Sequence, residues 1–297
     1  MIIAAVQRDI NMSDLFALLT DPDLPFFRYA VLTGLFAAIP FGVIGTFVVV
    51  RRISYLAGAI SHCVLAGIGG GLYLQKVVGI SWVTPQQGAI VVALLAAVIL
   101  TLVSLREGER EDSVIGALWS AGMAIGLLFI AATPGYFDPM SYLFGNILLV
   151  TRTDLVYVLG LDLLVLTVVG LFYNKFLALC FDDEYAWLRG VNTHWLYLVL
   201  LCLTALTIVL LVRIVGIVLV IALLTLPAAI GGNFARSILQ MMIYSTLFTM
   251  LFILSGLCIS YSLDLPSGPV IIVVATAVYL LVLSGRKLYH MLRTFTA

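Results

Sequence analysis

Long apolar runs alternate with short polar or charged stretches along almost the whole chain. Runs of this kind predict membrane-spanning helices, because about 20 apolar residues are needed to cross the hydrocarbon core of a bilayer. The predicted spans are residues 27–50, 53–74, 87–105, 113–133, 153–174, 194–212, 215–232, 238–261 and 269–285. The pattern therefore predicts an all-α, polytopic helical membrane protein with about nine transmembrane helices, or eight if one segment lies only partway in the membrane.

Composition supports a membrane protein and excludes several other classes. The chain has 297 residues, of which 63% are hydrophobic and 10% charged, whereas soluble domains are about 25% charged. The formal net charge is zero and no basic run is interleaved with aromatic residues, so we expect no nucleic-acid partner. The phosphate-binding loop G-x-x-x-x-G-K-[ST] is absent, so any ATP that drives this protein is expected to be hydrolysed by another subunit. We predict a single integral membrane domain over residues 1–297 and no enzyme activity.

The distribution of positive charge predicts the orientation. If the turn at Arg51 and Arg52 is cytoplasmic, ten of the 15 Lys and Arg residues lie on that side, as the positive-inside rule requires. The N-terminus, with segment 1–26, is then extracytoplasmic and the C-terminus is cytoplasmic.

A histidine lies near the middle of the second predicted span. His62 is about nine residues from the start of the span, or roughly 14 Å along a helix. Helical spacing places the small residues Gly58, Ala59, Ala66 and Gly69 on or beside its face. Two interpretations follow: a packing seam in which His62 is hydrogen-bonded to a neighbouring helix, or a transport path in which His62 contacts the cargo.

A second segment has the pattern of a short helix between spans. Asp182, Asp183 and Glu184 precede a run with Trp187, and Gly190 follows. Acids at a helix start complement the helix dipole, and a glycine often ends a helix. Capping accounts for part of this pattern, and an amphipathic cytoplasmic helix with an exposed tryptophan is also suited to docking.

The stretch "RRISYLAGAISHCVLAG" resembles the signature of the permeases of bacterial ABC importers for zinc, manganese and iron, whose usual form is an arginine pair followed by G-D-A-L-S-H-A-V-L-P-G. Further similar segments occur in the family order: "REGEREDSVIGALWSAGMAIGLLFI", "YLFGNILLVTRTDL", "FDDEYAWLRGVNTHWL" and "VGIVLVIALLTLPAAIGGNFAR". The resemblance covers nearly the whole chain from about residue 27.

The resemblance implies a type II ABC importer-like permease in the bacterial cytoplasmic (inner) membrane. It implies a homodimer of permeases within the membrane lipids, a cytoplasmic ABC ATPase dimer that binds ATP, and an extracytoplasmic metal-binding protein that delivers the ion. It also implies that residues 175–193 form the cytoplasmic coupling segment, which inserts into a groove of the ATPase. No permanently bound cofactor is expected, since the Zn, Mn or Fe ion is cargo.

The resemblance also names the residues expected along the path. In the family the aspartate and histidine of D-x-x-x-H contact the ion; His62 matches the histidine, but Gly58 takes the place of the aspartate. Gly58, Ser61 and Cys63 are expected to line the pathway, although Cys63 is turned about 100° from His62 around the helix. Asp162 is roughly 14 Å into its span and is the candidate replacement carboxylate. A structural aspartate bonded to another span is the alternative.

Other transport classes remain open on the sequence. A related permease for metal chelates or vitamin B12 would share the fold, and an ion-coupled secondary transporter would need membrane-embedded acids. Only Asp162 and Asp154 lie where such acids would be needed. Imidazole with a carboxylate or thiol fits Zn, Mn and Fe alike.

Overall fold

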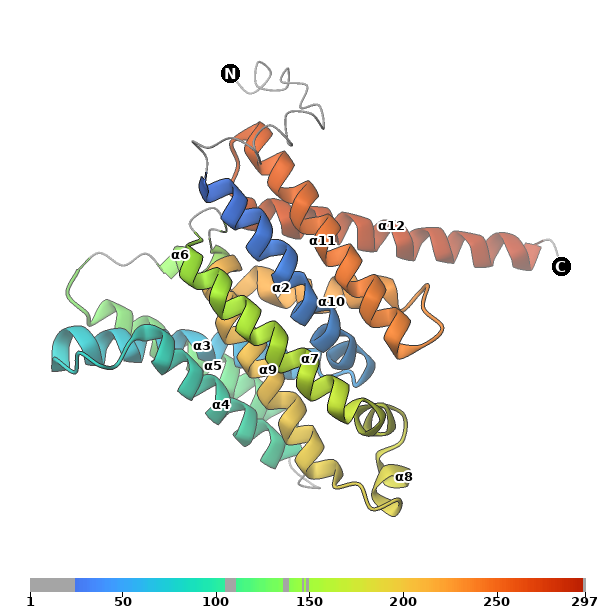
Figure 1. Cartoon of the computed structure of the whole chain (residues 1–297), viewed down its shortest axis with the longest axis horizontal. Coiled ribbons are helices and arrows are strands. Elements are labelled where there is room, and N and C mark those ends of the chain that lie inside the picture. The colour runs from blue at the N-terminus through green and yellow to red at the C-terminus, as the bar shows by residue number, and fades with distance from the viewer. Residues whose placement is uncertain (1–24, 105–110, 136–138, 146, 148–149, 296–297) are drawn as a thin grey trace.

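The protein is a bundle of α-helices (Figure 1). The computed structural model describes residues 25–104, 111–135, 139–145, 147 and 150–295, and within these ranges it contains helices and no strands. The helices in chain order are α2 (Pro25–Val50), α3 (Ser54–Tyr73), the π-helix η1 (Leu74–Val78), α4 (Pro85–Ser104), α5 (Glu111–Ala131), α6 (Pro139–Phe144), α7 (Arg152–Phe181), α8 (Asp183–Leu188), α9 (Thr193–Val215), α10 (Ile217–Gly231), α11 (Ile238–Leu263) and α12 (Ser267–Phe295). The all-α prediction is confirmed; of the predicted N-terminal segment 1–26, residues 1–24 lie outside the described residues.

The helices match the predicted spans, with one of them short. Eight helices in the described part of the chain are long and apolar enough to cross a membrane. The remaining apolar helix, α10, has 15 residues, or about 22 Å, against a hydrocarbon core of about 30 Å. The nine predicted segments are therefore all helical, and eight of them have spanning length.

Helix α7 is longer than the sequence predicted. The predicted span ends at residue 174, before Lys175, but the helix continues to Phe181. A lysine marks where a helix leaves the lipid, but it does not interrupt the backbone hydrogen bonds. Beyond it, Phe176 and Leu179 are buried, and the Phe176 ring lies 5.3 Å from that of Phe47 on α2. This packing extends the helix into the segment predicted to couple to the ATPase.

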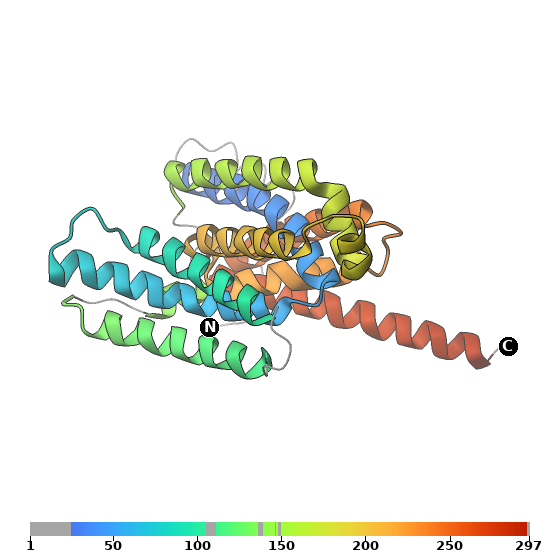
Figure 2. The ribbon, with the colours of Figure 1, turned by 90° about the horizontal axis from the view of Figure 1, so that it is seen from below.

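The helices form two groups joined by α9 and by a contact between α3 and α10 (Figure 2). Helix α3 packs between α4 and α5, while α2 packs on α7, α10 and α11, and α12 packs on α10 and α11. Helix α9 contacts α3 and α4 in the first group and α2, α7 and α10 in the second. His62 therefore belongs to the first group and Asp162 to the second.

Glycines allow α3 to lie very close to its two neighbours. A Cβ atom added to Gly67 would lie 2.5 Å from the carbonyl oxygen of Gly88 on α4. One added to Gly69 would lie 2.5 Å from the carbonyl oxygen of Gly126 on α5. Close backbone approach through small residues is typical of helix packing in membranes. The small residues in this half of α3 thus form a packing seam.

Polar contacts join several helices at one end of the bundle, which we call the α8 end. Arg51, which follows α2, forms an ion pair with Asp183 of α8 (3.1 Å). The hydroxyl of Ser104, the last residue of α4, lies 3.3 Å from that of Tyr197 near the start of α9. The α8 end therefore includes the C-terminal ends of α2, α4 and α7 and the N-terminal ends of α3 and α9.

Close backbone contacts mark the opposite end, which we call the α6 end. Gly216 separates α9 from α10 with a φ of +85°, and a Cβ atom there would lie 2.3 Å from the carbonyl carbon of Phe144 in α6. A Cβ atom on Gly268, at the start of α12, would lie 2.4 Å from the carbonyl oxygen of the same residue. The short helix α6 is thus held against α9, α10 and α12 by backbone contacts that only glycine permits.

The surface of the bundle is apolar, and its central helix, α10, is mostly covered. Leucines on α5, α7 and α12 are exposed, among them Leu128, Leu171 and Leu281, as expected of helices that face lipid. In contrast, no residue of α10 is exposed. Helix α10 is therefore mostly covered by the other helices, with one half-buried face formed by Val218, Ile221, Ala222, Thr225, Leu226 and Ala229.

Candidate functional site

His62 is held in a buried position on α3. It is 9% exposed, and its ring stacks on the indole of Trp119 from α5, with 4.4 Å between the ring centroids and 22° between the ring planes. The buried Nδ1 atom has no hydrogen-bond partner in the described part of the chain. A structural histidine in a membrane helix is expected to hydrogen-bond to a neighbour. The imidazole here makes a ring contact in place of that hydrogen bond.

The indole of Trp119 also covers Gly58, one helical turn before His62. A Cβ atom on Gly58 would lie 2.9 Å from Cζ3 of the indole and 3.3 Å from Cη2. Residues at i and i+4 share one face of a helix. One indole therefore occupies both the space beside His62 and the space that a side chain at position 58 would need.

The other two residues predicted along the path bond to helix backbone. The Ser61 hydroxyl is buried and donates to the carbonyl oxygen of Ala57 on the same helix (2.8 Å). The Cys63 thiol, also buried, donates to the carbonyl oxygen of Leu118 on α5 (3.3 Å). Ser61 therefore bonds within α3, whereas Cys63 links α3 to α5.

Asp162 is buried in a different part of the bundle. It lies on the inner face of α7 and is 5% exposed, and neither carboxyl oxygen has a hydrogen-bond partner among the described residues. Helix α7 packs on α2 and α9, whereas α3 packs on α4, α5 and α9. Within the described ranges, no three His, Cys, Asp or Glu side chains form a group that could hold a metal ion. The structure thus places Asp162 apart from the stack of His62 on Trp119.

The register of α2 and α7 places a hydroxyl at the level of Asp162. These helices run side by side in the same direction, with Phe47 against Phe176 (Figure 1). Counting back an equal number of residues from these two rings leads to Thr33 and Asp162. The Thr33 hydroxyl is also buried and without a hydrogen-bond partner in the described part of the protein. Two buried polar groups on adjacent helices therefore lie at the same depth.

The predicted coupling segment contains the short helix α8. Asp182 is its N-cap and accepts a hydrogen bond from the backbone N–H of Tyr185 (2.8 Å). Gly190 follows the helix with a φ of +79°, which favours glycine. Ala186 is buried beneath the helix, whereas Trp187 is 64% exposed. The capping predicted from the sequence is confirmed, and the exposed aromatic face points away from the bundle.

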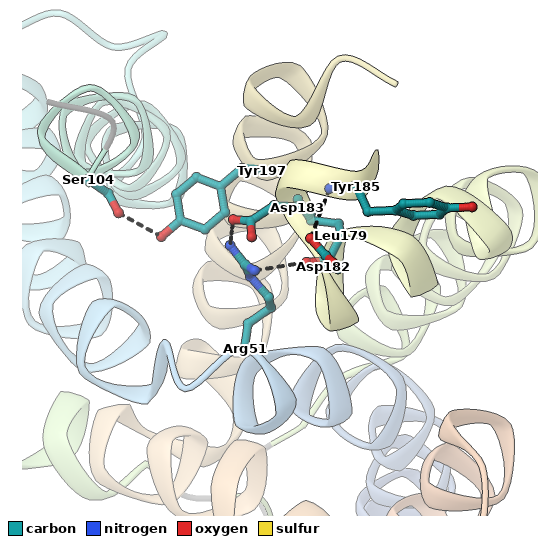
Figure 3. A network of polar contacts seen from close by, with 7 residues as sticks. All are labelled: Arg51, Ser104, Leu179, Asp182, Asp183, Tyr185 and Tyr197. Carbon is teal, nitrogen blue, oxygen red and sulfur yellow. Dashed lines mark hydrogen bonds and ion pairs between the residues drawn. The ribbon is translucent and has the colours of Figure 1, made fainter. Parts of the chain in front are cut away.

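Arg51 joins α8 to the turn between α2 and α3 (Figure 3). Its guanidinium donates to the carbonyl oxygen of Leu179 near the end of α7 (2.8 Å) and to the carboxylate of Asp183 (3.1 Å). The same guanidinium lies 5.8 Å from the ring centre of Tyr197 on α9. A single side chain therefore ties together the ends of α2, α7 and α9 and the first residue of α8.

A model of one protein family matches most of this chain. The model of the ABC 3 transport family covers residues 23–286. The chain belongs to the ABC 3 transport family. The family that the signature around His62 indicated is thereby confirmed.

Members of this family from several bacteria are similar over nearly their whole length. A probable metal transport system membrane protein of Chlamydia pneumoniae is 43% identical over 261 residues, which are 87% of this chain and 88% of that protein. The manganese transport system membrane protein MntC of Listeria monocytogenes is 31% identical over 254 residues, 86% of this chain and 88% of that protein. The solved structure of PsaBC from Streptococcus pneumoniae in complex with Fab contains a chain that is 29% identical, with a TM-score of 0.80 over 92% of this chain and 95% of that one.

The family assignment and the structure together define the class of protein. With eight helices of spanning length in its described part, this ABC 3 family member is a multi-pass membrane protein and a transport permease. The fold is that of an ABC permease.

The sequence did not indicate the roles of Trp119 and Arg51 in this structure. Trp119 is the one aromatic residue in the stretch "GALWSAGMAIG", which is rich in glycine and alanine, and this is the one local signal for a specific contact. Arg51 was noted for its charge and as part of the arginine pair, and Arg52 beside it is exposed. Neither pattern says which helix the side chain will contact.

Proposed function

We propose that this chain is the membrane permease of an ATP-driven importer of divalent transition-metal ions, with manganese as the first ion to test. The family supports the transport class, and relatives named as manganese transport proteins support the choice of ion. The observation that carries the proposal is the buried imidazole of His62, whose Nδ1 has no hydrogen-bond partner among the described residues. An ionisable side chain near the middle of a membrane helix is by default a functional residue.

In this proposal two copies of the permease form a homodimer around a central path, and His62 supplies an imidazole ligand to the ion. Asp162 is the second candidate ligand, at a separate position on α7, since both of its carboxyl oxygens are buried and without a partner in the described part of the chain. Imidazole and carboxylate ligands suit Mn, Fe and Zn. Gly58, Ser61 and Cys63 lie beside His62 on α3, where this path would pass.

The coupling segment, residues 175–193, docks on a cytoplasmic ABC ATPase dimer that binds ATP. The exposed face of α8 supports this role, with Glu184 and Trp187 turned outward and Asp182 and Gly190 bounding the helix. Asp183, the first residue of the helix, pairs with Arg51 and remains half exposed. Closure of the ATPase dimer would move α8 as a lever, and Arg51 would pass that movement to the turn before α3. The α8 end is then cytoplasmic, and the α6 end receives the ion from an extracytoplasmic binding protein.

Reconstitution of the permease with its ATPase in proteoliposomes tests this function. We expect uptake of Mn²⁺ that requires ATP and the binding protein, and loss of most uptake in His62→Ala at unchanged protein level. Uptake driven by an ion gradient without ATP would instead identify a secondary transporter. Uptake of vitamin B12 or a metal chelate, with none of the free ion, would identify the related importer class.

A further inference from the structure

The contact between Trp119 and His62 points to a function of the indole in the metal path. The two rings are close to parallel, so the indole covers the face of the imidazole and leaves the ring edge uncovered by this contact. A metal ion binds the lone pair of an imidazole nitrogen, which lies in the ring plane at that edge. The stack therefore fixes the plane of the imidazole without blocking the atoms that would bind an ion.

Histidine ligands are usually oriented in another way. A metal-binding histidine almost always donates its second ring N–H to a carboxylate, carbonyl or water, and this bond sets the ring orientation. The buried Nδ1 of His62 has no such partner among the described residues. The neighbouring Ser61 and Cys63 side chains bond to backbone carbonyls and leave His62 without their support. The indole of Trp119, which stacks on the imidazole, can hold the imidazole ring in its orientation.

The same indole explains why position 58 is a glycine. Any side chain there would begin 2.9 Å from the indole and would push it away from His62. The absence of a side chain at Gly58 thus leaves room for the Trp119 ring, which orients the histidine. The space beside His62 is consequently aromatic and uncharged where a carboxylate would have added an oxygen ligand.

We propose that Trp119 is a positioning and specificity-determining residue of the metal path. Its indole orients the His62 imidazole by stacking, and it fills the space that a carboxylate side chain at position 58 would need. This inference rests on the proposed function, in which His62 contacts the ion. At the position of His62, an imidazole without a neighbouring carboxylate favours transition metals over Mg²⁺ and Ca²⁺, which prefer oxygen ligands. It also holds the ion weakly, as a path that must release its cargo requires.

Mn²⁺ binding to the purified full-length permease tests the role of the stack, with free Mn²⁺ measured by electron paramagnetic resonance. A stacked aromatic pair contributes enough that Trp119→Leu is expected to weaken Mn²⁺ binding by about three- to tenfold. Trp119→Phe keeps a ring and is expected to stay within about twofold of the wild type. The control Trp195→Leu removes an indole that contacts Phe172 elsewhere in the bundle, and it is expected to leave binding unchanged.

A pair of milder variants tests the same idea without removing the tryptophan. Gly58→Ala places one methyl group against the indole and is expected to weaken Mn²⁺ binding by pushing the ring off His62. Gly58→Ala combined with Trp119→Phe restores space and is expected to recover binding. Equal Mn²⁺ affinity in the wild type and Gly58→Ala would overturn the positioning role even if Trp119→Leu failed to fold.

Measuring Mn²⁺ binding of Trp119→Leu in a His62→Ala background separates this inference from the proposed function. If the stack acts through His62, Trp119→Leu adds nothing once the imidazole is gone. Loss of binding in His62→Ala, with wild-type binding in Trp119→Leu, would overturn the role of Trp119 alone. Unchanged binding in His62→Ala would overturn the proposed ligand itself.

Competition between Ca²⁺ and Mn²⁺ gives an independent test of the proposed selectivity. The double variant Gly58→Asp with Trp119→Ala places a carboxylate one turn from His62 and removes the ring that excludes it. We expect Ca²⁺ to compete with Mn²⁺ in this variant and not in the wild type. Equal competition by Ca²⁺ in both proteins would contradict the proposed basis of selectivity.

Discussion

Replacing Arg51 by alanine is expected to separate ATP hydrolysis from metal uptake, because this side chain joins α8 to the turn that precedes α3. The guanidinium reaches the Leu179 carbonyl at 2.8 Å and the Asp183 carboxylate at 3.1 Å. The substitution removes both contacts and leaves Glu184 and Trp187 on the exposed face of α8 unchanged. The ATPase should therefore still bind and hydrolyse ATP, while the motion of α8 no longer reaches the path.

The size of the effect follows from the surroundings of each contact. The bond to the Leu179 carbonyl is partly buried and its donor is charged, so it contributes about 1.5–3 kcal/mol. The ion pair contributes less, about 1 kcal/mol at most, because the Asp183 side chain is 54% exposed and solvent screens the pair. Arg51→Ala should then cost roughly 2–4 kcal/mol in the attachment of the turn before α3 to the end of α7 and the start of α8, most of it from the bond to α7. This is less than the stability of most folded domains.

The assay measures Mn²⁺ taken up per ATP hydrolysed in proteoliposomes that contain the permease, the ATPase and the binding protein. We expect the ratio to fall severalfold in Arg51→Ala, and to fall only slightly in Asp183→Asn, which keeps the bond to the Leu179 carbonyl. Arg52→Ala is the matched control, since the neighbouring arginine is exposed. A normal ratio in Arg51→Ala, or an equal loss in Arg52→Ala, would refute the proposed link.

Three further predictions concern topology, packing and the second buried site. Leu188→Cys should react with impermeant thiol reagents only from the cytoplasm and Leu265→Cys only from outside, and the reverse pattern would overturn the orientation. Gly216→Ala should destabilise the protein by about 2 kcal/mol or more, because its φ is +85° and a methyl group would meet backbone at 2.3 Å. Gly160→Ala, with nothing within 4 Å of the added atom, should gain up to about 1 kcal/mol, and equal melting temperatures in the two variants would contradict this reasoning. Asp162→Asn should lower Mn²⁺ uptake and raise the melting temperature, since a buried carboxylate without a partner is costly; unchanged uptake would remove Asp162 from the path.

Charge predicted some helix ends and missed others: the span ends predicted before Arg51 and Arg106 lie within one residue of the ends of α2 and α4. Gly216 ends α9 within a few residues of the predicted boundary, because a positive φ interrupts the helix. Lys175 and Arg286 mark the ends of two predicted spans, yet α7 and α12 continue past them. Charge decides where a helix leaves the lipid, whereas only the backbone decides where it ends. Apolar patterns therefore predict spans well and helix lengths poorly.

The candidate site was predictable only where its residues are neighbours in the chain. The signature around His62 and the capping of α8 are local patterns. The stack of Trp119 on His62 and the bond from Arg51 to Leu179 join residues that are distant in the sequence. Small residues on α3 indicated that another helix lies close, but they carry no information about which helix, or about the ring it presents.

Helix α10 has little contact with lipid, so its length need not match the thickness of the bilayer. A helix that faces lipid must match the hydrocarbon core, and it tilts or strains the membrane when it does not. None of the residues in α10 is exposed, although one face is half-buried, so its length of about 22 Å creates little mismatch with the lipid around the protein. In thicker or thinner membranes the outer helices, such as α5, α7 and α12, are the ones that must adjust. Changes in membrane thickness should therefore reach α10 mainly through the tilt of its neighbours.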